Sequence, residues 1–277
     1  MSDLIGPTAL FGGLDDPQLR IVDVRWYLGE PERGPLAYSH GHLPGAVFAN
    51  LEAHLTAPEG PGRHPLPTRA EAAATLGSLG IGDEHSVITY DDRGGAIAAR
   101  LWWMLRDLGH ERVRVLDGGI TAWRDAGLPV TTEVPCLEPA HLTVRVGTTR
   151  RIDRDGLSER LGGVLVLDAR APERYRGEEE PIDPAAGHIP TAHNVPYAGN
   201  LDDRERLLDP GSLRARFVAA GVGDGDTIVY CGSGVTACHN VLAMRLAGLP
   251  EPILYPGSWS DWSSSGMPVA AGPDPGA

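Results

Sequence analysis

Short runs of apolar residues alternate along the chain with longer segments of helical periodicity. Apolar runs of this kind, bounded by loop residues, are typical of buried strands in a parallel sheet. The runs that predict strands are Ile21–Val24, Val87–Tyr90, Val113–Leu116, Val164–Leu167, Thr227–Tyr230 and Pro252–Leu254. Apolar residues spaced three and four apart predict helices over Ala96–Leu108 and Thr236–Leu246, with Gly109 and Gly248 as the stop signals. This alternation predicts an α/β fold with a parallel sheet flanked by helices.

The same series of motifs occurs twice along the chain, in the same order. The matched pairs are Ile21–Arg25 with Val166–Arg170, Gly41–Ala46 with Gly187–Ala192, Gly80–Asp83 with Gly221–Asp224, Ser86–Tyr90 with Asp226–Tyr230, and Gly127–Val130 with Gly266–Val269. Matched blocks in one order indicate two copies of one domain rather than a solenoid of short repeats. We expect an N-terminal domain over residues 1–134, a linker over 135–148, and a C-terminal domain over 149–277.

The length of 277 residues suits two domains, and the composition, 42% hydrophobic and 22% charged, is that of a globular protein. No stretch is long and apolar enough for a transmembrane helix, and the N-terminus does not have the pattern of a secretory signal peptide. The formal net charge of −13 argues against nucleic-acid binding. The chain contains no lysine, which excludes a lysine Schiff base or a lysine general base.

The chain has three cysteines, Cys136, Cys231 and Cys238, and no Cys-x-x-Cys spacing. This small, odd number predicts neither a disulfide framework nor a metal site, and it suits a reducing, cytoplasmic setting. Cys238 lies two turns along a predicted helix from Cys231, and we interpret it as a core residue, with a resolving thiol as the alternative. Cys136 falls in the linker. No metal or organic cofactor is implied.

Cys231 directly follows a predicted strand and precedes a glycine-rich turn into a helix. Ligands of parallel sheets bind beyond the carboxyl ends of the strands. The N–H groups at a helix N-terminus have no helical acceptor, and Gly232 and Gly234 allow the loop to curl around an anion. These donors and the helix dipole stabilise a thiolate, which makes Cys231 a candidate nucleophile. A buried, inert cysteine at a strand end is the alternative.

The residues around Cys231 exclude several cysteine chemistries. A protein phosphatase of the Cys-x5-Arg type needs an arginine where this chain has Ala237. A thioredoxin-like Cys-x-x-Cys site needs a second cysteine where Gly234 stands. A cysteine protease needs a histidine base and a peptide groove, and nothing in the sequence marks such a groove. Transfer of sulfur through a persulfide is the chemistry that remains.

The loop Cys231–Ala237, which reads Cys-Gly-Ser-Gly-Val-Thr-Ala, resembles the active-site loop of tandem-domain sulfurtransferases of the rhodanese superfamily. It is most similar to their 3-mercaptopyruvate sulfurtransferase branch, and the resemblance covers nearly the whole chain. The other motifs that carry it are Trp26–Leu28, Gly41–Ala46, Gly118–Gly119, Asp168–Arg170, Arg174–Gly177 and Pro256–Trp262. The resemblance implies two rhodanese domains, of which the C-terminal one is catalytic and the N-terminal one silent. Consistent with this, Asp91 stands in the first repeat where the second has Cys231.

The resemblance also implies roles for individual residues. The loop residues expected to bind the substrate are Gly232, Ser233, Gly234, Val235, Thr236 and Ala237. In the 3-mercaptopyruvate branch the loop serine is expected to work with a histidine and an acid, which match His64 and Glu52 here. Arg174 matches an arginine that binds the substrate carboxylate, and a second such arginine is missing because Ile182 and Asp183 occupy that stretch. The alternatives are an ordinary loop histidine and an ordinary surface arginine.

Gly232 and Ser233 are neutral at positions where thiosulfate-specific members of the superfamily carry basic residues. We therefore expect a loop without added positive charge, and a monocarboxylate, 3-mercaptopyruvate, rather than thiosulfate as the sulfur donor. The sulfur would pass through a Cys231 persulfide to cyanide or to a thiol such as reduced thioredoxin. A thiosulfate sulfurtransferase and a non-catalytic sulfur carrier or partner-binding module are the alternatives.

Overall fold

The computed structural model describes residues 2–276, which divide into two compact units. Unit 1 comprises residues 2–57, 67–148 and 203–207, and unit 2 comprises residues 58–66, 149–202 and 208–276. Two short segments, 58–66 and 203–207, therefore group with the unit that does not contain their neighbours in sequence. Residues 135–148, the expected linker, group with unit 1.

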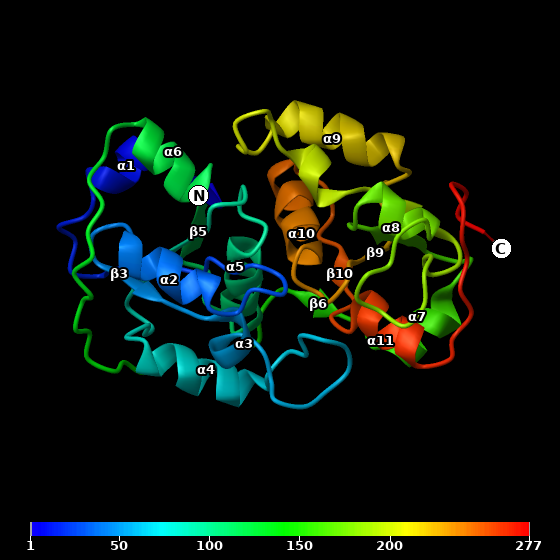
Figure 1. The fold of residues 1–277 in the computed structure, drawn as a ribbon, viewed down its shortest axis with the longest axis horizontal. Coiled ribbons are helices and arrows are strands. Elements are labelled where there is room, and N and C mark those ends of the chain that lie inside the picture. Colours follow the sequence, from blue (N-terminus) through cyan, green and yellow to red (C-terminus); the bar gives the residue numbers. More distant parts are fainter. Residues whose placement is uncertain (1, 277) are drawn as a thin grey trace. The chain divides into compact units, whose positions relative to one another are not determined.

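Each unit is built on a five-stranded parallel sheet, and the two sheets have the same topology (Figure 1). Unit 1 contains β1 (Leu4–Ile5), α1 (Pro7–Phe11), β2 (Leu19–Asp23), α2 (Arg33–His40), β3 (Ala46–Phe48), α3 (Leu51–His54), α4 (Arg69–Ser78), β4 (Ser86–Tyr90), α5 (Ala98–Asp107), β5 (Val113–Leu116) and α6 (Gly119–Asp125). Unit 2 contains β6 (Arg150–Arg151), α7 (Arg154–Arg160), β7 (Leu165–Asp168), α8 (Pro172–Arg176), β8 (Ala192–Asn194), the 3-10 helix η1 (Tyr197–Asn200), α9 (Pro210–Ala219), β9 (Thr227–Tyr230), α10 (Ala237–Leu246), β10 (Ile253–Leu254) and α11 (Ser258–Ser264).

The strand orders are β1-β5-β4-β2-β3 in unit 1 and β6-β10-β9-β7-β8 in unit 2. The predicted α/β fold is thus confirmed, and all six predicted strands are present. The sequence did not predict β1, β3, β6 and β8, which are the edge strands of the two sheets. Each of these has only two or three residues, so it is too short to show a hydrophobic run.

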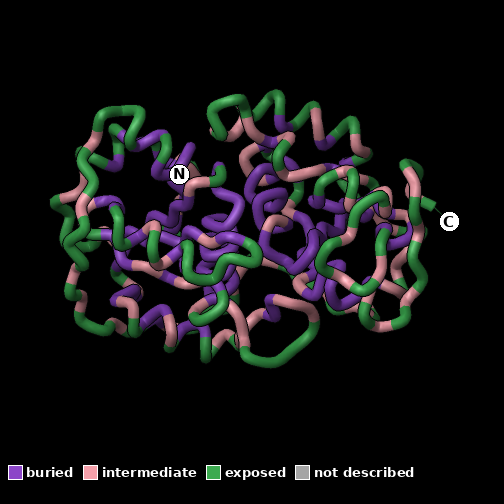
Figure 2. The backbone as a smooth tube through the Cα atoms, in the orientation of Figure 1, coloured by how far each residue is buried: buried purple, intermediate pink, exposed green. Residues whose placement is uncertain are grey.

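The helices after the central strands begin later than the apolar periodicity predicts. The helix predicted from Ala96 begins at Ala98, and the helix predicted from Thr236 begins at Ala237. The preceding residues form the loops that follow β4 and β9. Both helices are largely buried, and Figure 2 shows them among the buried parts of their units. These loops therefore lie at the carboxyl ends of central strands, where α/β proteins bind ligands.

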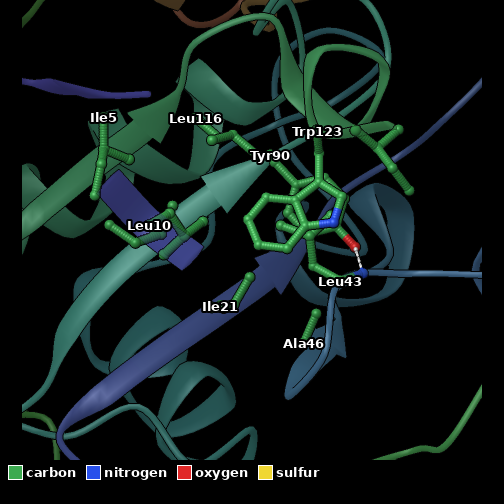
Figure 3. Packing of buried hydrophobic residues seen from close by; sticks show 10 residues of the cluster. Ile5, Leu10, Ile21, Leu43, Ala46, Tyr90, Leu116 and Trp123 are labelled. Atoms are coloured by element: carbon green, nitrogen blue, oxygen red, sulfur yellow. Dashed lines mark hydrogen bonds between the residues drawn. The ribbon is translucent and has the colours of Figure 1, made fainter. Parts of the chain in front are cut away.

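The core of unit 1 gathers around the middle of its sheet, where side chains from several strands and helices meet (Figure 3). Tyr90 at the end of β4 is fully buried there, and its hydroxyl accepts the N–H of Leu43 at 3.2 Å. Beside it the ring of His42 stacks on that of Tyr38, with 3.9 Å between centroids. Tyr230 accepts the corresponding N–H in unit 2 at 3.1 Å, so the repeated Gly-His-x-Pro motif has a structural role.

No helix within residues 2–276 is long and apolar enough to cross a bilayer. The longest helices have ten residues each, about half of what a membrane span needs.

Candidate active site

Cys231 lies where the sequence predicts, directly after β9 and six residues before α10. The residue is 2% exposed, and the loop residues that follow it are also mostly buried. Gly234 has φ +74°, and a Cβ at that position would collide with the carbonyl oxygen of Pro256. The second glycine of the loop is therefore required both by its backbone conformation and by the close approach of another segment.

The corresponding loop of unit 1 is an internal comparison for the cysteine loop. Its first residue, Asp91, is fully buried, and its carboxylate accepts four backbone N–H groups. The donors are Arg93 at 2.9 Å, Gly95 at 2.9 Å, Ile97 at 2.7 Å and Ala98 at 2.9 Å. The strand–loop–helix turn of this fold is therefore a cradle of backbone donors that holds a negative charge.

In unit 2 the first residue of the same cradle is a cysteine, which places no carboxylate among the donors. The loop N–H groups that donate to no acceptor within residues 2–276 are those of Gly232, Ser233, Val235, Thr236 and Ala237. Buried N–H groups without a partner are costly and rare, so their concentration here needs an explanation. An anionic sulfur species or an anionic substrate bound at Cys231 would satisfy them.

The segment Gly257–Ser260 forms hydrogen bonds with the backbone of the cysteine loop. The N–H groups of Trp259 and Ser260 donate to the carbonyls of Cys231 and Gly232, both at 2.9 Å. The Ser258 hydroxyl accepts the N–H of Cys231 at 3.1 Å and donates to the carbonyl of Tyr255 at 2.9 Å. Cys231 is therefore fixed through both its N–H and its carbonyl group.

The role of Ser258 is not evident from the sequence pattern around Cys231, but the repeat contains a signal for it. Ser258 is fully buried at φ +55°, a conformation that glycine adopts far more readily than serine. Gly119, the matching residue of unit 1, has the same φ of +55°, and a Cβ there would collide with the carbonyl oxygen of Asp91. The second repeat thus has a strained serine where the first has glycine, and that serine contacts Cys231.

His64 and Ser233 lie together in unit 2. Residues 58–66 group with this unit, and the Nδ1 atom of His64 is 2.8 Å from the Ser233 hydroxyl, both side chains being buried. Glu52 belongs to unit 1, where it is exposed and accepts the indole N–H of Trp26 at 3.2 Å. The structure thus joins the predicted serine and histidine, while a role for Glu52 beside them stays a prediction.

Arg174 lies against the first glycine of the loop, and it is accompanied by a second arginine that the sequence did not predict. A Cβ on Gly232 would lie 3.3 Å from Nη1 of Arg174 and 3.2 Å from Nη2 of Arg63. The loop itself carries no positive charge, as expected, but Arg63 and Arg174 place guanidinium groups from other segments against it. Two buried carboxylates, Asp183 and Glu180, pair with these arginines, so the neighbourhood carries both signs of charge.

The remaining residues named from the sequence lie around this site. Arg170 is buried and forms an ion pair with Asp168, with 2.6 Å between Nη2 and Oδ2. It also donates to the carbonyl of Gly187, which indicates a structural role. Cys238 is fully buried in α10, and its Sγ donates to the carbonyl of Gly234, whereas Cys136 is exposed. Burial and then the charge of Asp168 raise the pKa of Tyr230, so this hydroxyl stays protonated.

Comparisons with known proteins find relatives that match nearly the whole chain. The rhodanese-like domain family matches residues 7–126 and again residues 153–265. A Pseudomonas aeruginosa protein with the provisional name 3-mercaptopyruvate sulfurtransferase is 44% identical, over 98% of this chain and 99% of its own. A Mycobacterium tuberculosis protein with the provisional name thiosulfate sulfurtransferase SseB is 45% identical, over 90% and 89% of the two chains. The crystal structure of SseA from Escherichia coli, described as a 3-mercaptopyruvate sulfotransferase, superposes with a TM-score of 0.83 at 32% identity, covering 94% and 100%.

The chain therefore belongs to the rhodanese family, with two rhodanese-like domains. It is a sulfurtransferase, because relatives that match nearly its whole length are named as sulfurtransferases. The family and the class of enzyme expected from the sequence are confirmed, whereas these relatives are named for two different sulfur donors.

Proposed function

We propose that this enzyme takes sulfur from 3-mercaptopyruvate and carries it as a persulfide on Cys231. The hydrogen bond between His64 and Ser233, beside the nucleophile loop, is the observation that carries the choice of donor. Removal of sulfur from 3-mercaptopyruvate leaves an enolate, which must gain a proton to become pyruvate. Removal of sulfur from thiosulfate leaves sulfite, which needs no proton. A buried serine and histidine that can move a proton therefore favour the carbon-containing donor.

The chemical step is a displacement at sulfur. The Cys231 thiolate forms a bond to the donor sulfur, and the carbon–sulfur bond breaks with its electron pair on carbon. The proton of the donor thiol then moves to this carbon, by way of Ser233 and His64, to give pyruvate and an anionic persulfide. The unpaired N–H groups of the loop stabilise the negative charge of the persulfide, as the cradle of unit 1 stabilises that of Asp91.

In the second half of the cycle the outer sulfur leaves the persulfide. Cyanide takes it as thiocyanate, and a thiol such as reduced thioredoxin takes it by attack on the outer sulfur; either restores the Cys231 thiolate. We assign catalysis to the C-terminal domain, residues 149–277, and consider the N-terminal domain silent because Asp91 has no thiol that could accept sulfur from the donor. We place the enzyme in the cytoplasm, where reducing conditions keep such a thiol free.

Thiosulfate is the second candidate donor, and one observation favours it. Arg63 and Arg174 both lie against Gly232, and two cations near the nucleophile suit a dianion. The buried carboxylates that pair with these arginines offset much of this charge, which is why we rank thiosulfate second.

Steady-state rates with the two donors, measured side by side with cyanide as acceptor, test the proposal. We expect kcat/KM to be at least tenfold higher for 3-mercaptopyruvate. His64→Gln should reduce the rate with 3-mercaptopyruvate more than the rate with thiosulfate, because only the former needs a proton transfer. A wild-type enzyme that uses thiosulfate faster would reverse the order of the two candidates.

A further inference from the structure

The turn between β10 and α11 holds the hydroxyl of Ser258 in one orientation (Figure 1). This hydroxyl has one proton, which it donates to the carbonyl of Tyr255 at 2.9 Å. Toward the N–H of Cys231, which lies at 3.1 Å, it therefore acts as the acceptor. The carbonyl of Tyr255 thus sets the orientation of the group that contacts Cys231.

The side chain of Tyr255 is in turn held by Asp261 on α11, and both residues are buried. The Tyr255 hydroxyl donates to Oδ2 of Asp261 at 2.6 Å, and Nη1 of Arg154 donates to Oδ1 at 3.2 Å. Burial and then the hydrogen bond to Asp261 raise the pKa of Tyr255, so this hydroxyl keeps its proton and remains the donor. Arg154 on α7 is thus connected through these two residues to Ser258.

One side of this turn borders a cavity. The cavity has a volume of about 560 Å³ and is lined in part by Tyr255, Pro256, Gly257 and Asp261. Side chains that border a cavity lack packing contacts on that side. The backbone at Ser258 is moreover strained, at φ +55°. A strained turn beside a cavity depends on hydrogen bonds to keep its conformation, and the contact between Tyr255 and Asp261 supplies one.

Unit 1 has the same turn without this polar contact. The position that matches Ser258 is a glycine with the same φ of +55°. Three residues before it, Leu116 stands where unit 2 has Tyr255. Three residues after it, Ala122 stands where unit 2 has Asp261. Neither a leucine nor an alanine side chain can form a hydrogen bond, so the polar residues occur together in the unit that has the cysteine.

We propose that Tyr255 and Asp261 position Cys231 through Ser258. The inference rests on the proposed role of Cys231 as the sulfur carrier, and it does not depend on which donor supplies the sulfur. The contact between Tyr255 and Asp261 keeps the strained turn closed. The Ser258 hydroxyl then stays directed at the N–H of Cys231, and the thiolate stays among the N–H groups of its loop. Both are positioning residues, because they act on Cys231 through another residue.

The test is a double-mutant cycle in the full-length enzyme, with Tyr255→Phe and Ser258→Gly. Tyr255→Phe removes one hydroxyl, and we expect kcat to fall about three- to tenfold while KM stays within about twofold. The fall should be equal with 3-mercaptopyruvate and with thiosulfate, since the change acts on Cys231 and not on the donor. In the Ser258→Gly background, Tyr255→Phe should have no further effect on kcat, because the connecting hydroxyl is gone.

Tyr38→Phe is the matched control. Tyr38 is a buried tyrosine of unit 1 whose hydroxyl donates to the carbonyl of Ala46 at 2.7 Å, so a hydrogen bond of similar length is lost far from this turn in sequence. Its kcat should stay within about twofold of the wild type. A Tyr255→Phe enzyme with the kcat of the control would contradict the proposal. So would a loss that persists in full in the Ser258→Gly background, which is the result expected if Tyr255 only stabilises the fold.

Asp261→Asn provides a second cycle should the phenylalanine variant fail to fold. Asparagine keeps the size of the side chain but removes the charge that strengthens the contacts to Arg154 and Tyr255. We expect kcat to fall at least about twofold with Ser258 present and not in the Ser258→Gly background; equal losses in both would overturn the proposal. Sulfur loading separates this inference from the proposed function. Sulfur on a residue other than Cys231 refutes the proposed carrier, whereas a loaded Cys231 with additive variants refutes the positioning role alone.

Discussion

Replacing Asp91 by asparagine tests whether the backbone N–H groups of the unit 1 loop bind the negatively charged Asp91 carboxylate. Each carboxylate oxygen accepts two N–H groups, from Arg93 and Gly95 on one side and from Ile97 and Ala98 on the other. Asparagine keeps one oxygen but turns an NH2 group toward the other two donors. Two hydrogen bonds to a charged acceptor are lost, at about 1.5–3 kcal/mol each.

Removal of a buried charge offsets part of this loss, because the carboxylate no longer has to be desolvated. We therefore expect Asp91→Asn to lower the free energy of unfolding by about 2–4 kcal/mol. Urea unfolding followed by tryptophan fluorescence measures this change, with the exposed Asp125→Asn as a control expected to stay within about 0.5 kcal/mol. Below the unfolding transition, turnover of Asp91→Asn should match the wild type.

Two results would refute this reasoning. A stability equal to that of the control variant would mean that the four N–H groups do not depend on the carboxylate. A well-folded Asp91→Asn or Asp91→Ala enzyme without turnover would mean that the first domain takes part in catalysis.

Three further changes test separate parts of the account. Ser233→Ala should lower kcat/KM about tenfold with 3-mercaptopyruvate but at most threefold with thiosulfate; equal losses would contradict the proton relay. Ser258→Gly removes both the strained conformation and the hydroxyl, so thermal stability should be kept while alkylation of Cys231 slows severalfold; an unchanged rate would contradict a positioning role. Hydrogen bonds from Arg150 and Arg160 hold the pKa of Asp226 well below its usual value, so this carboxylate stabilises the fold above about pH 4 and less below it. Asp226→Asn should therefore lower the melting temperature at pH 7 and by a smaller amount at pH 3; equal effects at both would exclude this linkage.

The sequence predicts the part of the site that is local in the chain. Cys231 follows a recognisable strand, and its glycines and the helix after it lie within a few residues, so the cradle could be predicted from one segment. The repeat added Asp91 as the matching residue. The sequence analysis did not pair Gly119 with Ser258; this difference between the repeats emerges from the backbone conformation and the contact to Cys231.

The contacts that the sequence could not predict join distant segments. Arg63 lies far from Asp183 and Gly232 in the chain, and only the packing of residues 58–66 within unit 2 brings them together. The neutral loop could not reveal Arg63 beside Gly232 for this reason. A neutral residue in a loop says nothing about the charges that other segments place against it.

The central claim is that Cys231 carries the sulfur, and intact-protein mass spectrometry tests it directly. Incubation with 3-mercaptopyruvate and no acceptor should add one sulfur atom, about 32 Da, and cyanide should remove it. Peptide mapping should place the adduct on Cys231, and Cys231→Ser should acquire none. An adduct on Cys238 or Cys136, or a loaded Cys231→Ser protein, would contradict the account.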